Sequence, residues 1–430
     1  MKIEINETGK WQNSLTIKMV LLAVTGLFLL IPLQLIKEMI LERQQNSEII
    51  KDEISSQWSG KQLISGPVLN IPIIKYPSKK DAEPYKIVFH LMPEKLNIKS
   101  DISAETRHRG IYKTVVYSSP VNIDGIFLIP ELSFSEKTDV LWQEAYFSIG
   151  ISDNRGIKGS ISLVANDKAF EAIPGVKDFD LYKTGITFPA FVDPVTKQIS
   201  FSVLMQVAGS ESLSFTPLGK ETKVNMVSSW NSPGFTGNFL PVERNITNSG
   251  FKASWLVTNL NRNFPQSWIG DEYKTEQDSF GTAFILEADH YQKSVRSAKY
   301  GILFIALTFL ALIFTEMTQK EKINIFHYLL MALGLVLFFS LLNALSEHTG
   351  FSIAYVVSAV STIALIGSFL KALMKSSRPV LLTTGLLVFL YSFIFILLSL
   401  KDYAYLAGNL GLFILLAITM KLSLKLKDLS

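Results

Sequence analysis

The sequence contains no cysteine and carries little net charge. Without cysteine, the 430-residue chain forms no disulfide, has no thiol nucleophile and offers no thiolate to a metal ion. A net charge of +4 at pH 7 provides no general attraction to nucleic acid. The chain also lacks the G-x-S-x-G, P-loop, H-E-x-x-H and G-x-G-x-x-G motifs. We therefore predict no nucleic-acid partner, no cofactor and no enzyme of these motif classes.

Histidine is scarce, and its spacing is not that of a metal site. The five residues are His90, His108, His290, His327 and His348. Metal-binding motifs bring histidine, cysteine or carboxylate ligands together at short, regular spacings. We predict no metal site and assign no catalytic residue. Paired carboxylates for hydrolysis leave no local signature, so that class of enzyme stays open but is not favoured.

Long apolar runs are present at both ends of the chain. A membrane-spanning helix needs about 20 apolar residues. Met19–Ile36 meets this length and follows Lys10 and Lys18. A cleaved signal peptide is the alternative. However, the run is longer than a signal-peptide core, and no small-residue cleavage site occurs in the KEMILERQQ that follows it. We predict an uncleaved anchor.

Five further apolar segments occur in residues 299–430. They are Tyr300–Thr315, Ile325–Leu345, Phe351–Leu370, Val380–Leu400 and Tyr403–Met420. The connections are only a few residues long, so we expect consecutive helices to pack antiparallel. With the anchor, these segments predict a multi-pass α-helical membrane protein with six transmembrane helices.

The distribution of Lys and Arg predicts the orientation in the membrane. If residues 1–18 are cytoplasmic, six spans return the C-terminus to the cytoplasm. The cytoplasmic segments then hold eleven Lys and Arg residues, whereas the short loops on the other side hold only Lys401. Positively charged short loops favour the cytoplasmic side. Residues 37–298 are therefore expected to be periplasmic in a cell with two membranes.

The segment 37–298 reads as a β-rich domain. Short runs of β-branched and aromatic residues alternate with Gly, Pro, Asn and Ser, which is typical of a sandwich or barrel. Examples of predicted strands are Val68–Tyr76, Ile111–Tyr117, Ala145–Ser152 and Lys197–Val207. Only Glu38–Ser56 has a helical pattern, as a stalk that continues the first anchor. The sequence predicts an all-β domain on a helical stalk.

A weak internal repeat suggests two tandem β-sandwich-like modules, at 60–180 and 185–295. Leu91-Met92 precedes Ser119-Pro120 by the spacing that separates Leu204-Met205 from Ser232-Pro233. Chance similarity between turn-rich β sequences is the alternative explanation.

Two arginines occupy equivalent places in the proposed repeat, Arg155 in ISDNRGI and Arg262 in TNLNRNF. For both arginines we favour a structural role, such as bonding to turn carbonyls, over ligand binding.

A polar cluster lies where the second helix of the C-terminal bundle ends. Asn343, Glu347 and His348 form our candidate functional cluster, in the segment NALSEHTG. The next segment carries a polar stripe at helical spacing, made of Ser352, Tyr355, Ser358 and Thr362. Ionisable groups at membrane depth are costly and often functional. The alternatives are that Glu347 and His348 lie at the water interface and that the hydroxyl groups serve helix packing.

Several segments together resemble the CreD family of inner-membrane proteins, which are associated with cell envelope integrity. They include MILERQ, ISGPVLNIP, LMPEKL, RGIY, SDNRGI, SPGFTGNFLP, SGFKASW, NLNRNF, KYGILFIALTFL and LLNALSEHTGFSIAY. The resemblance covers nearly the whole chain. It implies a Gram-negative inner membrane, expression linked to a two-component sensing system, and a part in colicin tolerance and β-lactam stress. It supplies no reaction and no catalytic residue.

Three functional hypotheses follow from these patterns. The favoured one is a non-enzymatic envelope protein whose β domain binds a periplasmic protein or peptidoglycan, with the lipid bilayer around its helices. A transporter or channel formed by the helical bundle is the second. The third is a membrane enzyme acting on lipid or peptidoglycan precursors, with Glu347 and His348 as an acid/base pair. Adjacent helical residues point about 100° apart, which weakens the third hypothesis. The ligand and the oligomeric state are not predicted.

Overall fold

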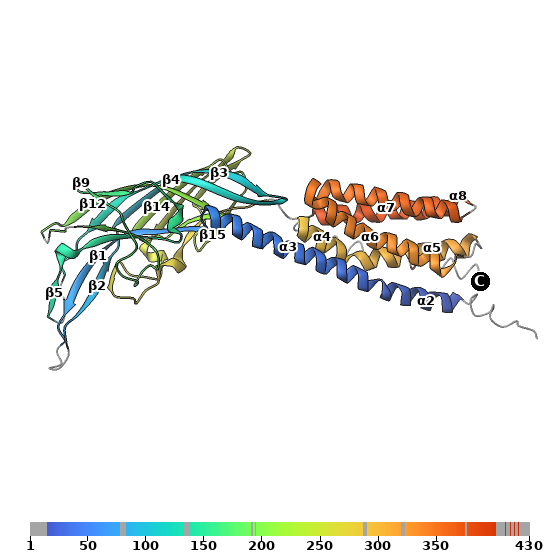
Figure 1. The fold of residues 1–430 in the computed structure, drawn as a ribbon, viewed down its shortest axis with the longest axis horizontal. Coiled ribbons are helices and arrows are strands. Elements are labelled where there is room, and N and C mark those ends of the chain that lie inside the picture. The colour runs from blue at the N-terminus through green and yellow to red at the C-terminus, as the bar shows by residue number, and fades with distance from the viewer. Residues whose placement is uncertain are drawn as a thin grey trace, which may run out of the picture. The chain divides into compact units, whose positions relative to one another are not determined.

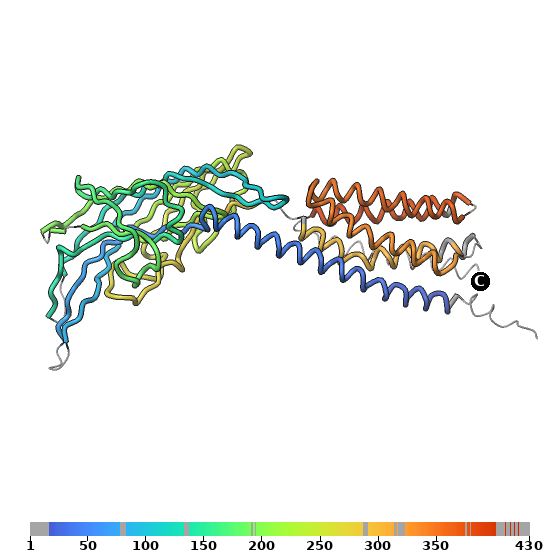
Figure 2. Tube along the Cα trace, viewed as in Figure 1, coloured from blue at the N-terminus to red at the C-terminus, as the bar shows by residue number. Residues whose placement is uncertain are grey.

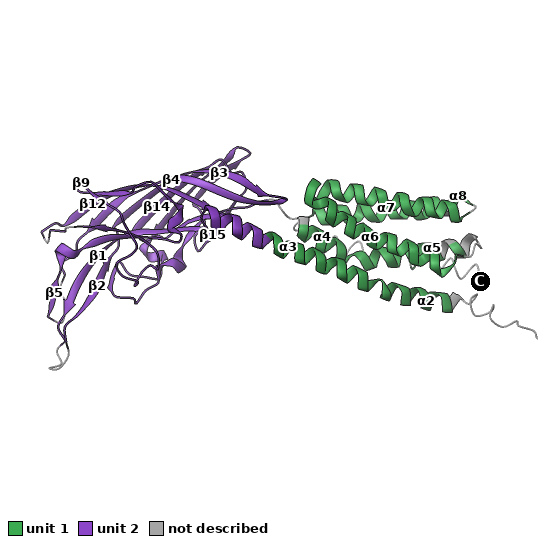
Figure 3. Ribbon diagram, viewed as in Figure 1, with its two compact units in different colours: residues 1–47, 288–430 green, residues 48–287 purple. Residues whose placement is uncertain are grey.

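The chain divides into a helical unit and a β unit, coloured separately in Figure 3. The computed structural model describes residues 15–77, 83–132, 137–190, 192–193, 195–286, 290–319, 323–374, 376–400, 409, 413, 417 and 420. The helical unit consists of residues 1–47 and 288–430, and the β unit of residues 48–287. Helix α3 contains the boundary between the two units (Figure 1).

Seven helices are described. They are α2 Leu15–Phe28, α3 Leu30–Trp58, α4 His290–Lys299, α5 Gly301–Gln319, α6 Ile325–Thr349, α7 Phe351–Leu373 and α8 Ser377–Ser399. Helices α5, α6, α7 and α8 contact one another and lie side by side in Figure 2. Large apolar side chains such as Phe28 of α2 and Leu381 of α8 remain exposed, as expected for helices that face lipid.

Five described helical segments are long and apolar enough to span a membrane. They are Ile17–Trp58, Tyr291–Ile313, Ile325–Thr349, Phe351–Leu373 and Val380–Ser399. They contain or overlap five of the six spans predicted from hydropathy. The predicted sixth span, Tyr403–Met420, falls almost entirely outside the described residues. The helix predicted at Glu38–Ser56 is confirmed within α3, but its residues up to 47 belong to the helical unit rather than to the β unit.

One boundary predicted from the sequence is wrong. The β-rich domain was expected to continue to residue 298, but residues 290–299 form helix α4, which belongs to the helical unit. Tyr291 and Ala298 are buried in the core of that unit, and Val295 packs against it. The HYQKSVRSAK segment is apolar on one face and polar or charged on the other. Its mean hydropathy is therefore low, and hydropathy alone does not assign it to the helical unit.

The β unit contains two mixed sheets in its described residues, one of ten strands and one of nine. The ten-stranded sheet has the order β10-β11-β6-β1-β13-β19-β15, with β2, β5 and β18 attached. Its strands are β1 Gln62–Lys75, β2 Tyr85–Leu91, β5 Thr138–Val140, β6 Tyr146–Ile151, β10 Ile173–Pro174, β11 Gly185–Pro189, β13 Ser212–Phe215, β15 Pro233–Gly237, β18 Ser267–Ile269 and β19 Phe280–Phe284.

The nine-stranded sheet has the order β16-β17-β14-β3-β4-β12-β8-β9, with β7 paired to β12. Its strands are β3 Lys95–Arg109, β4 Tyr112–Leu128, β7 Ile157–Lys158, β8 Ser162–Ala165, β9 Lys168–Glu171, β12 Gln198–Ser210, β14 Glu221–Ser228, β16 Glu243–Thr247 and β17 Gly250–Thr258. The four strand examples predicted from the sequence coincide with parts of β1, β4, β6 and β12, although each example extends slightly beyond its strand.

The two sheets enclose one apolar core. Along β14 and the first part of β12 every second residue is buried, which is the pattern of a sheet with one covered face, whereas the end of β12 is buried on both faces. The buried side chains of both sheets, including Phe127, Phe147 and Trp255, belong to a single cluster. Strand β1 is buried along nearly its whole length, as expected for a central strand covered on both faces.

The sheets cross the boundary between the two predicted modules. Strand β1 pairs in parallel with β13, and β3 pairs in parallel with β14, so each sheet combines strands from 60–180 and 185–295. The β unit is therefore one compact unit rather than two independent sandwiches. The sequence repeat itself remains a prediction.

Candidate functional site at the end of helix α6

The last turns of α6 place the predicted cluster residues on different surfaces. Asn343 is buried, the Glu347 side chain is 5% exposed, and His348 is exposed. Asn343 and Glu347 are four residues apart and so share one helical face, whereas His348 points elsewhere. The helix ends at Gly350, whose φ of 80° and ψ of 161° occur almost only in glycine.

Glu347 connects three helices of the helical unit. Nη1 of Arg43, from α3, lies 3.0 Å from Oε2 and 3.3 Å from Oε1 of Glu347. The hydroxyl group of Tyr291, from α4, donates to Oε1 at 3.4 Å. A nearly buried carboxylate is strongly disfavoured without such partners. Glu347, near the end of α6, therefore joins that helix to the middle of α3 and to the start of α4.

Asn343, one turn earlier, presents a buried oxygen with no hydrogen-bond partner among the described residues. That atom is Oδ1, while the backbone carbonyl of Asn343 accepts a hydrogen bond from Oγ of Ser346 at 2.9 Å. On α7, Tyr355, Ser358 and Thr362 of the predicted stripe are buried, but Ser352 is exposed. Tyr355 donates to the carbonyl oxygen of Tyr391 at 2.9 Å. The stripe thus faces the inside of the bundle over three of its four residues.

A second polar cluster in the helical unit has no signal in the sequence. Lys18 of α2 forms an ion pair with Glu316 of α5, and Lys18 also donates to the carbonyl oxygen of Ile323 at 2.7 Å. Tyr328 of α6 donates to Glu316 at 3.0 Å. In the sequence, Lys18 and Glu316 each lie at the end of a predicted span. That position alone suggests only that each side chain lies at the membrane–water interface. The contact between them depends on helix packing.

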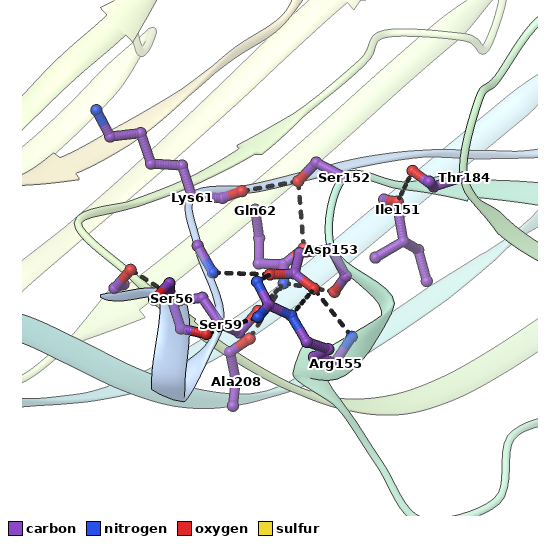
Figure 4. A network of polar contacts seen from close by, with 12 residues as sticks. Ser56, Ser59, Lys61, Gln62, Ile151, Ser152, Asp153, Arg155, Thr184 and Ala208 are labelled. Atoms are coloured by element: carbon purple, nitrogen blue, oxygen red, sulfur yellow. Dashed lines mark hydrogen bonds and ion pairs between the residues drawn. The ribbon is translucent and has the colours of Figure 1, made fainter. Parts of the chain in front are cut away.

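In the β unit, Arg155 belongs to a polar network around the end of α3 (Figure 4). Its Nη2 atom donates to Oδ2 of Asp153 at 2.7 Å, and its Nη1 atom donates to the carbonyl oxygen of Ser56 at 2.7 Å. Oδ2 of Asp153 also accepts a hydrogen bond from the backbone N–H of Gly60 at 3.1 Å. Hydrogen bonds from Arg155, supported by that backbone contact, hold the pKa of Asp153 well below its ordinary value.

Arg262 has the same kind of role in a more buried setting. Its Nη1 atom donates to the carbonyl oxygens of Phe264 and Pro265 at 3.0 and 3.1 Å. Burial lowers the pKa of Arg262 to about 10, although Asp278 opposes this shift. The predicted bonding of both arginines to backbone carbonyls is confirmed.

Comparison with known families identifies the chain. Residues 14–427 match the family described as "Inner membrane protein CreD". The chain belongs to the CreD family. A curated relative, "Inner membrane protein CreD" of Escherichia coli (strain K12), is 31% identical over 411 residues, which is 93% of this chain and 90% of the relative. The suspected family is thereby confirmed, and the chain is an inner-membrane protein.

A solved structure, an M1 zinc metallopeptidase from Deinococcus radiodurans, also matches part of the chain. It is 6% identical, covers 39% of this chain and 38% of its own, and superposes with a TM-score of 0.18. A TM-score this low carries no argument about fold or function.

The geometry at the end of α6 does not suit acid/base catalysis by Glu347 and His348 as a pair. Glu347 is already paired with Arg43, and the exposed His348 side chain is not hydrogen-bonded to it in the structure. General acid–base chemistry needs two groups that reach the same reacting atoms. The arrangement favours a role for Glu347 in joining helices.

Proposed function

We propose that the chain supports cell envelope integrity from the inner membrane by binding a periplasmic protein through its β unit. Three observations support this proposal: membership of the CreD family, the excess of Lys and Arg in the loops expected to be cytoplasmic, and an exposed sheet edge on the β unit. In this proposal the helices anchor the β unit, and the ion pair of Glu347 and Arg43 maintains their packing.

Strand β16 is the observation that carries the proposal. All five of its residues, Glu243–Thr247, are exposed, and within the described chain β16 pairs only with β17. Leu240, Val242 and Ile246, on and next to β16, are 68%, 69% and 48% exposed. An edge strand with apolar neighbours can accept an extended segment of another protein as an additional strand. The expected partner is therefore a protein with such a segment.

The hairpin geometry identifies the backbone groups that would bind the segment. Thr247 and Gly250 flank a two-residue turn, and such a flanking pair exchanges hydrogen bonds across the hairpin. Because the pattern alternates, Arg244 and Ile246 direct their N–H groups away from β17. A proline at Ile246 removes one outward donor and leaves the pairing with β17 intact.

The opposite edge of the same sheet provides a matched control. Strand β9 forms a hairpin with β8 in which Ala165 and Lys168 flank a two-residue turn. Ala169, which is exposed, therefore also directs its N–H group outward. Ala169→Pro changes an edge strand in the same way as Ile246→Pro but at the other end of the sheet.

Complementation of a deletion strain under envelope stress tests the proposal. We expect Ile246→Pro to fail to restore growth and Ala169→Pro to restore it, with equal amounts of both variants in the membrane. Full rescue by Ile246→Pro would contradict binding at β16. Failure of both variants would show that proline at either edge disables the sheet, so the loss at Ile246 would not be specific to β16.

A further inference from the structure

Three side chains from separate parts of the β unit converge at one place. His90 lies on β2, while Asp178 and Asp180 lie in the connection between β10 and β11. One potential ligand atom from each residue lies within 4.8 Å of the other two. The residues are brought together because β2 and β6 both pair with β1, and β11 pairs with β6. Asp178 and Asp180 are close in the sequence, but His90 lies far earlier in the chain, so no local spacing reveals the complete cluster.

The orientation of His90 is set by Asn70. The amide nitrogen of Asn70 donates to Oγ of Ser148 at 2.8 Å and to the carbonyl oxygen of Val68 at 3.2 Å. Oδ1 of Asn70 is thereby directed to Nδ1 of His90, at 2.7 Å. Nδ1 must then carry the hydrogen and donate it, which is how the second nitrogen of a metal-binding histidine is usually held.

The other ring nitrogen of His90 is buried and directed at the carboxylates. The side chain is 0% exposed, and Nε2 has no hydrogen-bond partner among the described residues. Nε2 lies 3.4 Å from Oδ2 of Asp180, longer than the roughly 2.7–2.9 Å of a hydrogen bond between an imidazolium and a carboxylate. With the hydrogen on Nδ1, the neutral ring of His90 presents the lone pair of Nε2 to the two carboxylates. A cation between these groups would stabilise that arrangement.

The carboxylate of Asp178 is itself held in position through both of its oxygen atoms. The hydroxyl group of Tyr146 donates to Oδ2 of Asp178. Oδ1 of Asp178 accepts a hydrogen bond from the backbone N–H of Asp180 at 3.2 Å. Lys177 lies over the Tyr146 ring, 4.8 Å from its centroid, so its charge is directed to the aromatic face. These contacts limit the rearrangement needed to bind an ion.

We propose that Nε2 of His90 and the carboxylates of Asp178 and Asp180 bind a divalent transition-metal ion, with Zn²⁺ as the best fit. One imidazole and two carboxylates are a mixed N/O donor set that suits Zn²⁺ better than Mg²⁺ or Ca²⁺. Bonds of about 2.1 Å in a tetrahedron place neighbouring ligand atoms about 3.4 Å apart. The separation of Nε2 and Oδ2 already has this value. A water molecule would complete the coordination.

The bound ion would connect strand β2 to the β10–β11 connection. It would therefore stabilise the β unit, because it binds the folded arrangement and not the unfolded chain. The same site would also couple the stability of this unit to the availability of zinc.

Zinc titration of the purified, EDTA-treated full chain in detergent tests this site. Trp268 packs near His90, with ring centroids 5.9 Å apart, so tryptophan fluorescence is a direct readout alongside calorimetry. We expect one equivalent of Zn²⁺ to bind and to raise the midpoint of thermal unfolding by about 5–10 °C at a hundredfold excess over Kd. Mg²⁺ at the same concentration should produce neither effect.

Substitution at the ligands distinguishes this site from adventitious binding. Asp180→Asn keeps the shape of the side chain but removes a metal ligand. Losing a residue that only supports a ligand lowers metal affinity up to about 100-fold, so losing a ligand should weaken zinc binding by at least that factor. Asp167→Asn and His108→Gln change exposed groups outside the cluster and should bind zinc like the unaltered chain.

Two results would overturn the proposal. One is the lack of saturable zinc binding by the unaltered chain. The other is binding that persists unchanged in the Asp178→Asn/Asp180→Asn double variant. Unfolding midpoints measured without metal show whether each variant retains its fold, so a folding defect is not mistaken for the loss of a ligand.

Discussion

At the scale of single residues, the ion pair of Arg43 and Glu347 is asymmetric. The carboxylate is 5% exposed, whereas the guanidinium is 48% exposed. Removing a partner from a buried charge costs far more than removing one from a charge that water can reach. The two partners therefore contribute differently when each is replaced.

We expect Arg43→Gln to destabilise the helical unit more than Glu347→Gln does. Arg43→Gln leaves a nearly buried carboxylate without its cation and should cost about 3 kcal/mol, the lower end of the range for broken buried pairs. Glu347→Gln leaves a guanidinium that water can solvate and should cost about 1 kcal/mol. Thermal unfolding in detergent, followed by helical ellipticity, measures both variants.

His348→Gln is the control for this comparison. The side chain is exposed, so its replacement should change stability by less than about 0.5 kcal/mol. Equal losses for Arg43→Gln and Glu347→Gln, or a larger loss for Glu347→Gln, would show that the carboxylate does not depend on Arg43.

Part of this site can be predicted from the sequence. Asn343 and Glu347 are four residues apart, so helical spacing alone puts both on one side of α6, and that side is buried. The partner of Glu347 cannot be predicted in this way, since Arg43 lies 304 residues earlier in the chain. The cluster of His90, Asp178 and Asp180 is hidden for the same reason, because strand pairing brings it together.

At the scale of elements, strand patterns are easier to predict than strand partners. Alternation along β12 reports that one face is buried, but it does not say which strand lies beside it. The parallel pairs of β1 with β13 and of β3 with β14 join distant segments of the chain, so the sequence pattern of each strand does not predict these pairings. Helix α4 cannot be predicted from hydropathy because only one of its faces is apolar. The long apolar helices can be predicted from their composition alone.

The network of Asp153 and Arg155 secures the end of α3 to the sheets of the β unit. We expect Asp153→Asn to lower the free energy of unfolding at pH 7 by about 1–3 kcal/mol, the cost of losing charged hydrogen bonds to a mostly buried group. Urea unfolding of the full chain measures this. Five of its six tryptophans lie between residues 58 and 268, so fluorescence reports mainly on the β unit.

The pH dependence of this effect follows from the lowered pKa of Asp153. A carboxylate with a lowered pKa in the folded state contributes its full stabilisation above its unfolded pKa, about 3.9, and loses it as pH falls toward the folded value. The difference between the unaltered chain and Asp153→Asn should therefore be constant near neutral pH and should shrink below about pH 4. A difference that grows on acidification would exclude this role.

At the scale of the whole molecule, the proposed function depends on which side of the membrane carries the β unit. The proposed contact at β16 and the proposed metal site both lie in residues 48–287. An envelope role through this unit requires it to be periplasmic. The distribution of Lys and Arg predicts that location, with eleven such residues in the segments expected to be cytoplasmic.

The lack of native cysteine makes this location directly measurable. A single cysteine can be introduced by Ser249→Cys in the β16–β17 turn or by Ser377→Cys at the start of α8, both at exposed positions. We predict that a membrane-impermeant maleimide labels the Ser249→Cys variant in intact spheroplasts and the Ser377→Cys variant only after lysis. The reverse pattern would place the β unit in the cytoplasm and contradict the proposed function.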